Sequence, residues 1–300
     1  ALNIVRATAM ARKTMRESRP DAIFSTGGYS SAPVVQAARS LGVPYIIHEQ
    51  NVVPGRTNRI NARTAYAVAT TFRNGSEHFE CKRIERTGMP IRRELRAESQ
   101  GSFDFDGRTP DGPRQIFVMG GSQGAIALNE AALATAVRMA GYGVTWLMAA
   151  GPQHYDAMLK SRDRLAVTDE FEIRAYLSAK EMGQAYFRSS LVVCRSGGSL
   201  AEVAAFRKPS VLVPYPLAFG NHQMKNAEEF AAMGAAQVLP QGDLSAATLE
   251  VRIRAWLEDD EAQAVAQQAL ADWDIPDTND RVLALLSAAR WWVTLAVAFT

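Results

Sequence analysis

Short apolar runs alternate with longer helical runs along most of the chain. Residues 115–119, 143–149 and 191–195 are mainly apolar, and each is followed by a turn that contains glycine and then by a helical stretch. An apolar run of this length bounded by glycine is typical of a strand buried in a parallel sheet. Repetition of strand, turn and helix indicates βαβ units. The pattern therefore predicts an α/β fold with parallel sheets.

The same alternation begins earlier in the chain. Residues 21–26 and 45–47 have the composition of buried strands, and a helical stretch at 30–41 lies between them. A polar segment rich in Gly, Pro and Asp interrupts the rhythm later on, as expected of a linker. We therefore expect two domains at 1–96 and 114–272, a linker at 97–113, and a C-terminal helix with an apolar tail at 273–300.

The most informative stretch is the loop at 120–125, Gly-Gly-Ser-Gln-Gly-Ala, between the strand at 115–119 and a helix at 126–139. Glycine lets the backbone approach a phosphate, and the free N–H groups at a helix start favour a negative charge. Ser122, Gln123 and Gly124 are therefore candidate ligands of a diphosphate. A tight structural turn would have the same composition.

A second glycine loop follows the strand at 191–195. Residues 196–199 read Ser-Gly-Gly-Ser, and Glu202 lies just inside the next helix. Two such loops fit a nucleotide, with backbone amides and Ser199 near the phosphates and a carboxylate that accepts hydrogen bonds from ribose hydroxyls. A glutamate in a first helical turn can also serve only to complement the helix dipole.

Other polar residues lie where the predicted strands end. The sequence His-Glu-Gln-Asn at 48–51 follows the strand at 45–47, and Arg92 follows a Gly-x-Pro turn. Gln223 and Asn226 lie near the start of a helix after the strand at 209–214. Ligands of parallel sheets gather at the carboxyl ends of the strands, so we expect these side chains to face a common cleft. For Arg92, an ordinary surface arginine is the alternative.

Composition narrows the class of protein. The chain has 47% hydrophobic and 21% charged residues, as in a globular protein, and no apolar run of the length that spans a bilayer. The apolar tail at 291–299 is too short to cross, which favours a packed helix or an interfacial anchor. Cys81 and Cys194 form no CxxC pair, which suits a reducing compartment better than a disulfide-built domain.

Positive charge is concentrated in the first third of the chain. Residues 1–96 hold 16 of the 33 Lys and Arg residues but only 7 of the 31 Asp and Glu residues, although the net charge of the whole chain is only +2. Such a surplus suits an anionic membrane surface or a pyrophosphate. The basic helix expected at 1–18 could lie on a membrane, although most such helices cover a sheet. No nucleic-acid-binding motif accompanies the charge, so we expect no nucleic-acid partner.

Four stretches together resemble the MurG family, the N-acetylglucosaminyltransferases of peptidoglycan synthesis in glycosyltransferase family 28. They are Gly27 to Pro33, His48 to Arg59, Gly120 to Ala125, and Pro214 to Ala227. The resemblance implies the GT-B architecture, with two Rossmann-like domains facing a cleft. It also implies a peripheral protein at the cytoplasmic face of the bacterial inner membrane, whose substrates are UDP-GlcNAc and undecaprenyl-pyrophosphoryl-MurNAc-pentapeptide.

The resemblance also suggests roles for individual residues. Asn51, Arg92, Ser122, Leu177, Glu202 and Gln223 match donor-contacting positions of the family, with uracil near Leu177, ribose at Glu202 and GlcNAc at Gln223. The reaction implied is an inverting attack of the MurNAc C4 hydroxyl on the donor, which needs a base. We expect Glu49, or else His48, to be that base. Helix N-termini can stabilise the departing diphosphate, so we expect neither a metal nor a cofactor.

One departure from the family leaves other functions open. The family's first strand and its Gly-Gly-Thr-Gly-Gly-His loop have no counterpart here, so we expect an N-terminally truncated first domain and catalysis that is weak or absent. The alternatives are a nucleotide-sugar-binding remnant without activity and a UDP-GlcNAc 2-epimerase of the same architecture. Binding of UDP-GlcNAc, combined with analysis of the products, distinguishes the three.

Overall fold

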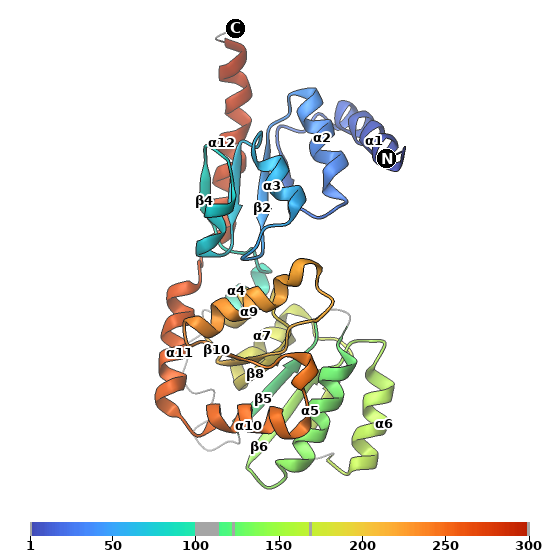
Figure 1. Cartoon of the computed structure of the whole chain (residues 1–300), viewed down its shortest axis with the longest axis vertical. Helices are drawn as coiled ribbons and strands as arrows, with labels where there is room; N and C mark the ends of the chain where they lie inside the picture. The colour runs from blue at the N-terminus through green and yellow to red at the C-terminus, as the bar shows by residue number, and fades with distance from the viewer. Residues whose placement is uncertain (1, 100–113, 122–123, 168–169, 299–300) are drawn as a thin grey trace. The chain divides into compact units, whose positions relative to one another are not determined.

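The computed structural model describes residues 2–99, 114–121, 124–167 and 170–298, and the chain divides into two compact units (Figure 1). The first comprises residues 1–90 and 277–300, and the second comprises Ile91–Pro276. Each unit has helices packed on a parallel sheet. This confirms the predicted fold class, an α/β protein with two Rossmann-like parts.

The first unit contains a sheet of four parallel strands in the order β1-β2-β3-β4. Its strands are β1 (Ile23–Ser25), β2 (Tyr45–Glu49), β3 (Ala67–Thr70) and β4 (Ile84–Arg86). Its helices are α1 (Leu2–Ser18), α2 (Ser31–Leu41), α3 (Arg56–Ala62), the 3-10 helix η1 (Arg73–His78) and α12 (Thr278–Ala298).

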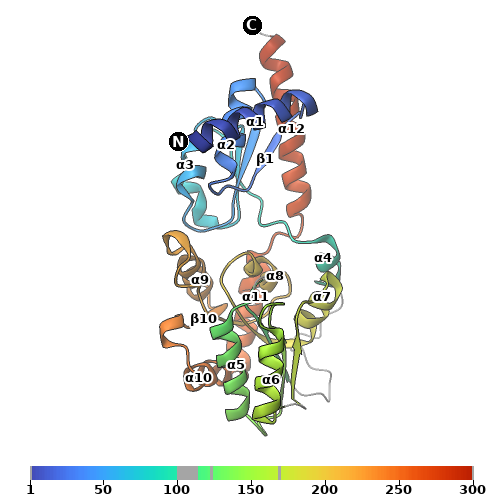
Figure 2. The same cartoon turned by 90° about the vertical axis from the view of Figure 1, so that its right-hand side faces the viewer.

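Alternate residues of β2 show how this sheet is covered on both faces. Tyr45 and Ile47 pack with apolar side chains of α1, α2 and α3, whereas Ile46 packs with Leu285 and Ala289 of α12. Figures 1 and 2 show α12 and the pair α1 and α2 on opposite sides of the sheet. Burial on both faces explains why these strands read as apolar runs rather than as alternating patterns.

The second unit contains six parallel strands in the order β10-β9-β8-β5-β6-β7. Its strands are β5 (Arg114–Met119), β6 (Val144–Ala149), β7 (Phe171–Arg174), β8 (Ser189–Cys194), β9 (Ser210–Leu212) and β10 (Ala236–Val238). The chain proceeds outward from β5 to β7 on one side, then returns to β8 beside β5 and proceeds to β10 on the other. A ligand crevice is expected where the order reverses, between β5 and β8.

Helices cover both faces of this second sheet. They are α4 (Arg93–Ser99), α5 (Ile126–Arg138), α6 (Tyr155–Leu165), α7 (Ala179–Arg188), α8 (Ser199–Ala205), α9 (His222–Ala232), α10 (Ala246–Leu257) and α11 (Asp260–Trp273), with 3-10 turns η2 (Phe219–Asn221) and η3 (Gln241–Asp243). Ile116 and Val118 pack with α5, α6 and α10 on one face. On the opposite face, Phe117 meets Tyr186 of α7 edge to face.

The two units do not divide at the predicted domain boundaries. α4 packs against α7, and the Arg96 guanidinium pairs with both oxygens of Asp274, at 2.5 and 3.0 Å, so residues 91–99 belong to the second unit. α12 belongs to the first unit, because Leu285 and Ala289 fill one face of its sheet. These contacts join residues far apart in sequence, which composition could not reveal. The predicted linker residues 100–113 lie outside the described part of the chain.

The searched helices include none that could cross a bilayer. Within the described residues, no helix combines the required length with sufficient apolar character.

Candidate functional site

The second unit contains a cavity of about 960 Å³ at the carboxyl ends of its strands. The loops after β5, β6, β7, β8 and β9 all contribute to its lining, together with Arg92 and Gln241. Of the predicted site residues, six line this cavity: Arg92, Gly124, Leu177, Ser199, Glu202 and Gln223. Five loops from one sheet edge thus converge on one space, as expected at a point where strand order reverses.

The first glycine loop is closely packed. A Cβ at Gly120 would lie 2.4 Å from the backbone nitrogen of Ala125. Gly124 has a φ of +75°, and its Cβ would lie 2.2 Å from the carbonyl oxygen of Ala150. Only glycine fits such contacts, and the close approach brings the backbone to the cavity wall. The predicted ligands Ser122 and Gln123 lie outside the described residues.

The start of the helix that follows this loop also lines the cavity. Ala125, Ile126 and Ala127 at the start of α5 line it, and none of the described side chains caps the helix. The first N–H groups of a helix lack partners within the helix, so they can bind an anion. The structure therefore has the strand, glycine turn and helix start that the sequence predicts.

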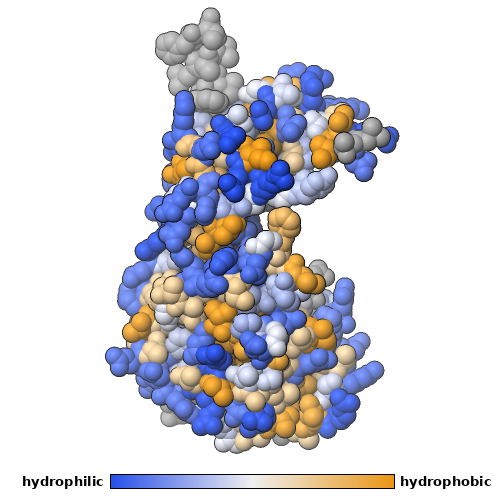
Figure 3. Space-filling model, viewed as in Figure 1, coloured by the Kyte–Doolittle hydropathy of each residue, from blue (hydrophilic) through white to orange (hydrophobic). Residues whose placement is uncertain are grey.

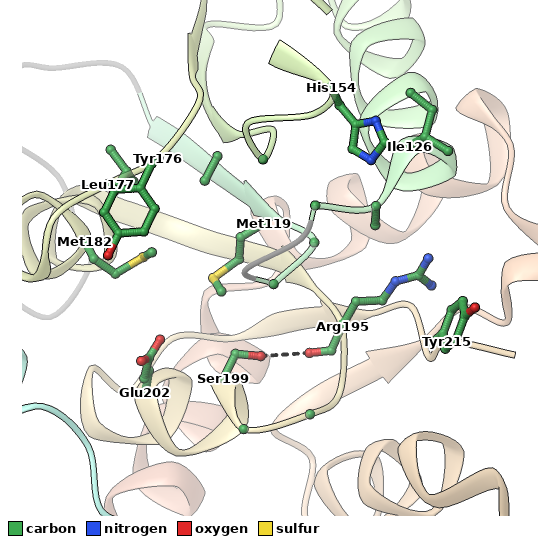
Figure 4. Close-up of a pocket in the computed structure, with 18 of the residues that line it drawn as sticks. Met119, Ile126, His154, Tyr176, Leu177, Met182, Arg195, Ser199, Glu202 and Tyr215 are labelled. Carbon is green, nitrogen blue, oxygen red and sulfur yellow. Dashed lines mark hydrogen bonds between the residues drawn. The ribbon is translucent and has the colours of Figure 1, made fainter. Parts of the chain in front are cut away.

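The second glycine loop opens on the same cavity. Gly197 and Gly198 follow β8, which pairs with β5, and both glycines line the cavity with Ser199. The Ser199 hydroxyl donates to the carbonyl oxygen of Arg195 at 2.9 Å (Figure 4). Because β5 and β8 are parallel neighbours, their two loops lie at one edge of the sheet. This arrangement can hold a diphosphate between two sets of backbone amides.

Arg195 is a site residue that the sequence analysis did not single out. Its guanidinium donates to the carbonyl oxygens of Val213 and Pro214, at 2.9 and 3.2 Å, and to Gln241 Oε1 at 2.6 Å. The side chain is 8% exposed, and burial lowers its pKa. Figure 4 shows it beside Tyr215, whose ring centroid lies 5.6 Å from the guanidinium carbon. The available signal was a charged residue at the end of the apolar strand predicted at 191–195, directly before the second glycine loop.

Gln223 and Asn226 have different surroundings, although they are neighbours on α9. Gln223 lines the cavity, and its Oε1 accepts a hydrogen bond from the Tyr215 backbone at 2.9 Å. Its Nε2, which has no acceptor among the described residues, is therefore the atom that can donate to a ligand. Asn226 is 1% exposed, and its amide donates to the Ser196 carbonyl at 3.1 Å. Its observed role is to support the second glycine loop, rather than to line the cavity as predicted.

The end of the cavity opposite Arg195 is more apolar. Leu177 and Met182 line it, and Leu177 is only 4% exposed. Tyr176 lies beside them with 65% of its surface exposed, and Figure 4 shows the three side chains together, across the first glycine loop from Tyr215. A flat apolar ring such as a nucleobase fits this environment.

Glu202 lies near this apolar end, in α8. The hydroxyl of Tyr186 donates to its Oε2 at 2.9 Å. Burial raises the pKa of Glu202, while the hydrogen bond from Tyr186 and the charge of Arg92 oppose that rise. A carboxylate that lines a cavity and is mostly buried is suited to accept hydroxyl donors from a ligand.

Glu49, predicted to be a base, has a structural role in the first unit. Its Oε1 accepts from the backbone of Gln50 and from the backbone and side chain of Asn51, at 2.9, 3.0 and 3.1 Å. Its Oε2 accepts from the backbone of Gly55 at 3.2 Å and from Asn58 at 2.8 Å. A carboxylate offers about four lone-pair sites. These five donors occupy Glu49, which is 2% exposed, so the geometry does not support its role as a base.

His48, the second predicted base, is also enclosed. It belongs to β2 rather than to the loop after it, it has no exposed surface, and its Nε2 lies 2.8 Å from the Gly88 carbonyl. Because a carbonyl only accepts, Nε2 carries the proton. Burial lowers the pKa of His48, so it is held neutral without access to a substrate. Asn51, the predicted donor contact beside them, is half-buried and bonded to Glu49.

A smaller cavity in the first unit is basic. It measures about 480 Å³ and is lined by Arg56, Arg59 and Arg63 of α3 and its C-terminus, with Ile60, His78 and Glu80. Ile60 is 55% exposed, and Arg63 pairs with Glu80 at 3.1 Å. Figure 3 shows the visible face of this unit as mainly hydrophilic with small hydrophobic spots.

As for metal ions, the described residues contain no group of three or more His, Cys, Asp or Glu side chains that could hold one.

Family comparisons cover most of the chain. The model of the glycosyltransferase family 28 C-terminal domain matches residues 115–281, and that of the N-terminal domain matches residues 1–70. A UDP-N-acetylglucosamine--N-acetylmuramyl-(pentapeptide) pyrophosphoryl-undecaprenol N-acetylglucosamine transferase of Levilactobacillus brevis is 33% identical over 93% of this chain and 77% of its own length. The enzyme of the same name from an Exiguobacterium species is 34% identical over 94% of this chain and 77% of its own.

Two solved structures resemble the chain to different degrees. The crystal structure of Acinetobacter baumannii MurG matches with a TM-score of 0.75 and 28% identity, over 96% of this chain and 79% of that one. A UDP-GlcNAc 2-epimerase of Neisseria meningitidis bound to UDP-GlcNAc matches with a TM-score of 0.69 over 95% of this chain and 81% of that one. At 11% identity, the second likeness concerns the fold alone.

Proposed function

The chain belongs to glycosyltransferase family 28 and is an N-acetylglucosaminyltransferase, and we propose that the cavity of its second unit binds UDP-GlcNAc. The acceptor is the one named for the relatives, lipid-linked N-acetylmuramyl-pentapeptide, and the product belongs to peptidoglycan synthesis. One observation carries the proposal: two glycine loops on neighbouring strands, together with the start of α5, line one cavity.

The lining suggests how the donor is oriented. We assign uracil to the apolar end at Leu177, ribose to Glu202 and the diphosphate to the two glycine loops. The sugar then lies toward Tyr215 and Gln223, whose Nε2 can donate to a hydroxyl oxygen of GlcNAc while its Oε1 is held by the Tyr215 backbone. Arg92, which also lines the cavity, supplies positive charge near Glu202.

The proposed reaction is an inverting transfer. The C4 hydroxyl oxygen of the acceptor attacks the anomeric carbon, its proton passes to solvent, the bond to the diphosphate breaks, and UDP leaves with the negative charge. Amides at the glycine loops and at the start of α5 stabilise that charge, which lowers the barrier without a metal ion. Turnover in excess EDTA tests this: unchanged activity is expected, and a loss restored by Mg²⁺ contradicts it. We assign no base to the acceptor hydroxyl, since Glu49 and His48 are enclosed.

A transfer assay tests the proposal. Labelled GlcNAc should pass from UDP-GlcNAc to a soluble lipid-linked MurNAc acceptor, with release of one UDP per transfer. Binding of the donor without transfer favours the alternative of a nucleotide-sugar-binding protein without activity. Formation of ManNAc or UDP-ManNAc favours an epimerase.

The same proposal places the protein peripherally at the inner face of the bacterial plasma membrane. Arg56, Arg59 and Arg63 around the smaller cavity, with exposed Ile60 beside them, provide positive charge and an apolar contact for anionic lipid. The exposed Val53 adds apolar surface in the preceding loop.

A further inference from the structure

Tyr186 is a buried residue whose hydroxyl is hydrogen-bonded to Glu202, which lines the cavity. It lies in α7, has no exposed surface, and donates to Glu202 Oε2 at 2.9 Å. Its ring is stacked on Phe206 at 5.1 Å between centroids and meets Phe117 edge to face at 5.2 Å. The hydroxyl also lies 3.1 Å from the sulfur of Met119. A phenol has one hydrogen, and a carboxylate is a much stronger acceptor than a thioether, so the hydrogen points to Glu202.

This hydrogen bond gives the two carboxylate oxygens of Glu202 different surroundings. Among the described residues, Tyr186 is the donor to Oε2, and no side chain or backbone group donates to Oε1. The rings of Phe206 and Phe117 fix the position of the hydroxyl, and the hydroxyl in turn limits the rotation of the carboxylate. Oε1 is therefore the atom that Glu202 offers to a ligand in the cavity that it lines.

We propose that Tyr186 is a positioning residue for recognition of the donor's ribose: by holding Oε2, it presents Oε1 of Glu202 to the vicinal 2′ and 3′ hydroxyls. This inference rests on the proposed donor site. It predicts that Tyr186 acts on affinity for a ribonucleotide only through Glu202, without touching the ligand.

The charge state of Glu202 depends on the same hydroxyl. Burial raises its pKa, and the groups that face it are Tyr186 from α7, Cys194 from β8 and Arg92 from the segment before α4. Burial raises the pKa of Cys194 to about 12 and that of Tyr186 well above its usual value, so both stay neutral near pH 7. The hydrogen bond from Tyr186 lowers the Glu202 pKa, and its removal should raise that pKa further.

Calorimetric titration of the whole chain with UDP-GlcNAc and with its 2′-deoxyribose analogue tests the proposal. The wild type should bind the ribose donor more tightly than the deoxy donor. Tyr186→Phe should weaken binding of the ribose donor about fivefold, as expected for one lost hydrogen bond, and leave binding of the deoxy donor less affected. Glu202→Gln should remove most of the discrimination, and Tyr186→Phe should add little in that background.

A matched control is available in the same unit. Tyr142→Phe removes another tyrosine-to-glutamate bond, to Glu258, at an exposed position outside the cavity, and should leave both affinities unchanged. The ratio of the two affinities does not depend on how much protein is folded, so it remains informative if Tyr186→Phe lowers stability. As pH falls, binding of the ribose donor should decline at a higher pH in Tyr186→Phe than in wild type.

The possible outcomes distinguish a failure of the role proposed for Tyr186 from a failure of the proposed donor site. If wild type binds UDP-GlcNAc and Glu202→Gln weakens it, but Tyr186→Phe keeps the wild-type affinity ratio and pH profile, the role of Tyr186 is overturned while the donor site stands. If wild type does not bind UDP-GlcNAc, the proposed function itself fails.

Discussion

Buried polar residues perform different tasks in the two units. In the first, Glu49 and His48 are enclosed and bonded to backbone and amide groups of loops that follow the strands. In the second, Glu202 and Arg195 line the cavity while each is held by a neighbour. Polarity after a strand therefore does not by itself distinguish a binding residue from one that organises a loop.

Replacement of Glu49 tests its structural role. Glu49→Gln leaves one acceptor oxygen and places an NH₂ group against backbone donors, so we expect a loss of about 2 kcal/mol in the free energy of unfolding. Urea denaturation followed by fluorescence measures it. Glu17→Gln, which removes a charge from an exposed pair with Lys13, should change stability by less than about 0.5 kcal/mol. Equal effects of the two substitutions would contradict the role assigned to Glu49.

His48 predicts a pH dependence of stability. Its pKa is lowered in the folded state by burial, so the unfolded chain binds the proton more readily. Stability from this group is fully present above the unfolded pKa of about 6.5 and is lost as pH falls toward the folded value. Between pH 7.5 and 5.5, the urea midpoint of wild type should fall more than that of His48→Gln. Parallel declines would show that His48 does not contribute.

The roles of single residues could be predicted from the sequence to different extents. Leu177 was identified through the resemblance, Glu202 already from its place after the second glycine loop, and both line the cavity. His48 and Glu49 were expected directly after a strand, because the pairing that extends β2 over them, with Ala69 and Thr70 of β3, joins residues that are distant in sequence. Tyr186 carried no local signal, since it belongs to an ordinary amphipathic helix and its partner lies on another helix.

At the scale of elements, the site depends on β5 and β8 being neighbours. Each strand delivers a glycine loop to the same sheet edge, and the reversal of strand order between them leaves space for a ligand. The sequence predicted both strands, both turns and the helices after them. It could not show that the two strands pair, because their pairing joins residues far apart in the chain.

Gly120→Ala tests the first loop. The added Cβ would lie 2.4 Å from the Ala125 nitrogen, so the turn must move and its amides lose their alignment. We expect donor affinity to fall at least about tenfold, measured by calorimetry with UDP-GlcNAc. Gly75→Ala, whose Cβ would meet Thr70 at an ordinary 3.5 Å in the first unit, is the control. A folded Gly120→Ala protein with wild-type affinity would show that this turn does not bind the donor.

At the scale of the whole molecule, the structure shows where part of the positive charge of the first 96 residues lies. The basic surplus of residues 1–96 includes three arginines around the cavity beside α3, whereas the cavity proposed to bind the nucleotide belongs to the other unit. The expected domain boundaries were displaced at both ends, because α4 packs on α7 and α12 packs on the first sheet. Helices at the ends of a segment join whichever core buries their apolar faces.

Binding to vesicles tests the proposed membrane contact. Arg56→Gln with Arg59→Gln should weaken sedimentation with phosphatidylglycerol vesicles about thirtyfold at low salt, since each arginine near an anionic surface contributes about 1 kcal/mol. Arg252→Gln with Arg254→Gln removes the same charge from α10 and should have little effect. Binding that is absent at low salt, or equally reduced in both double variants, would count against this surface.

The most direct test of the account is a titration of the protein with UDP-GlcNAc, comparing wild type with Gly124→Ala. Gly124 has a positive φ, and its Cβ would lie 2.2 Å from the Ala150 carbonyl, so alanine cannot occupy the turn without displacing it. We predict one saturable site in wild type that UDP competes for, and no measurable binding in a folded Gly124→Ala protein. Absence of binding in wild type, or undiminished binding in the variant, would contradict the assignment of the two glycine loops to the donor diphosphate.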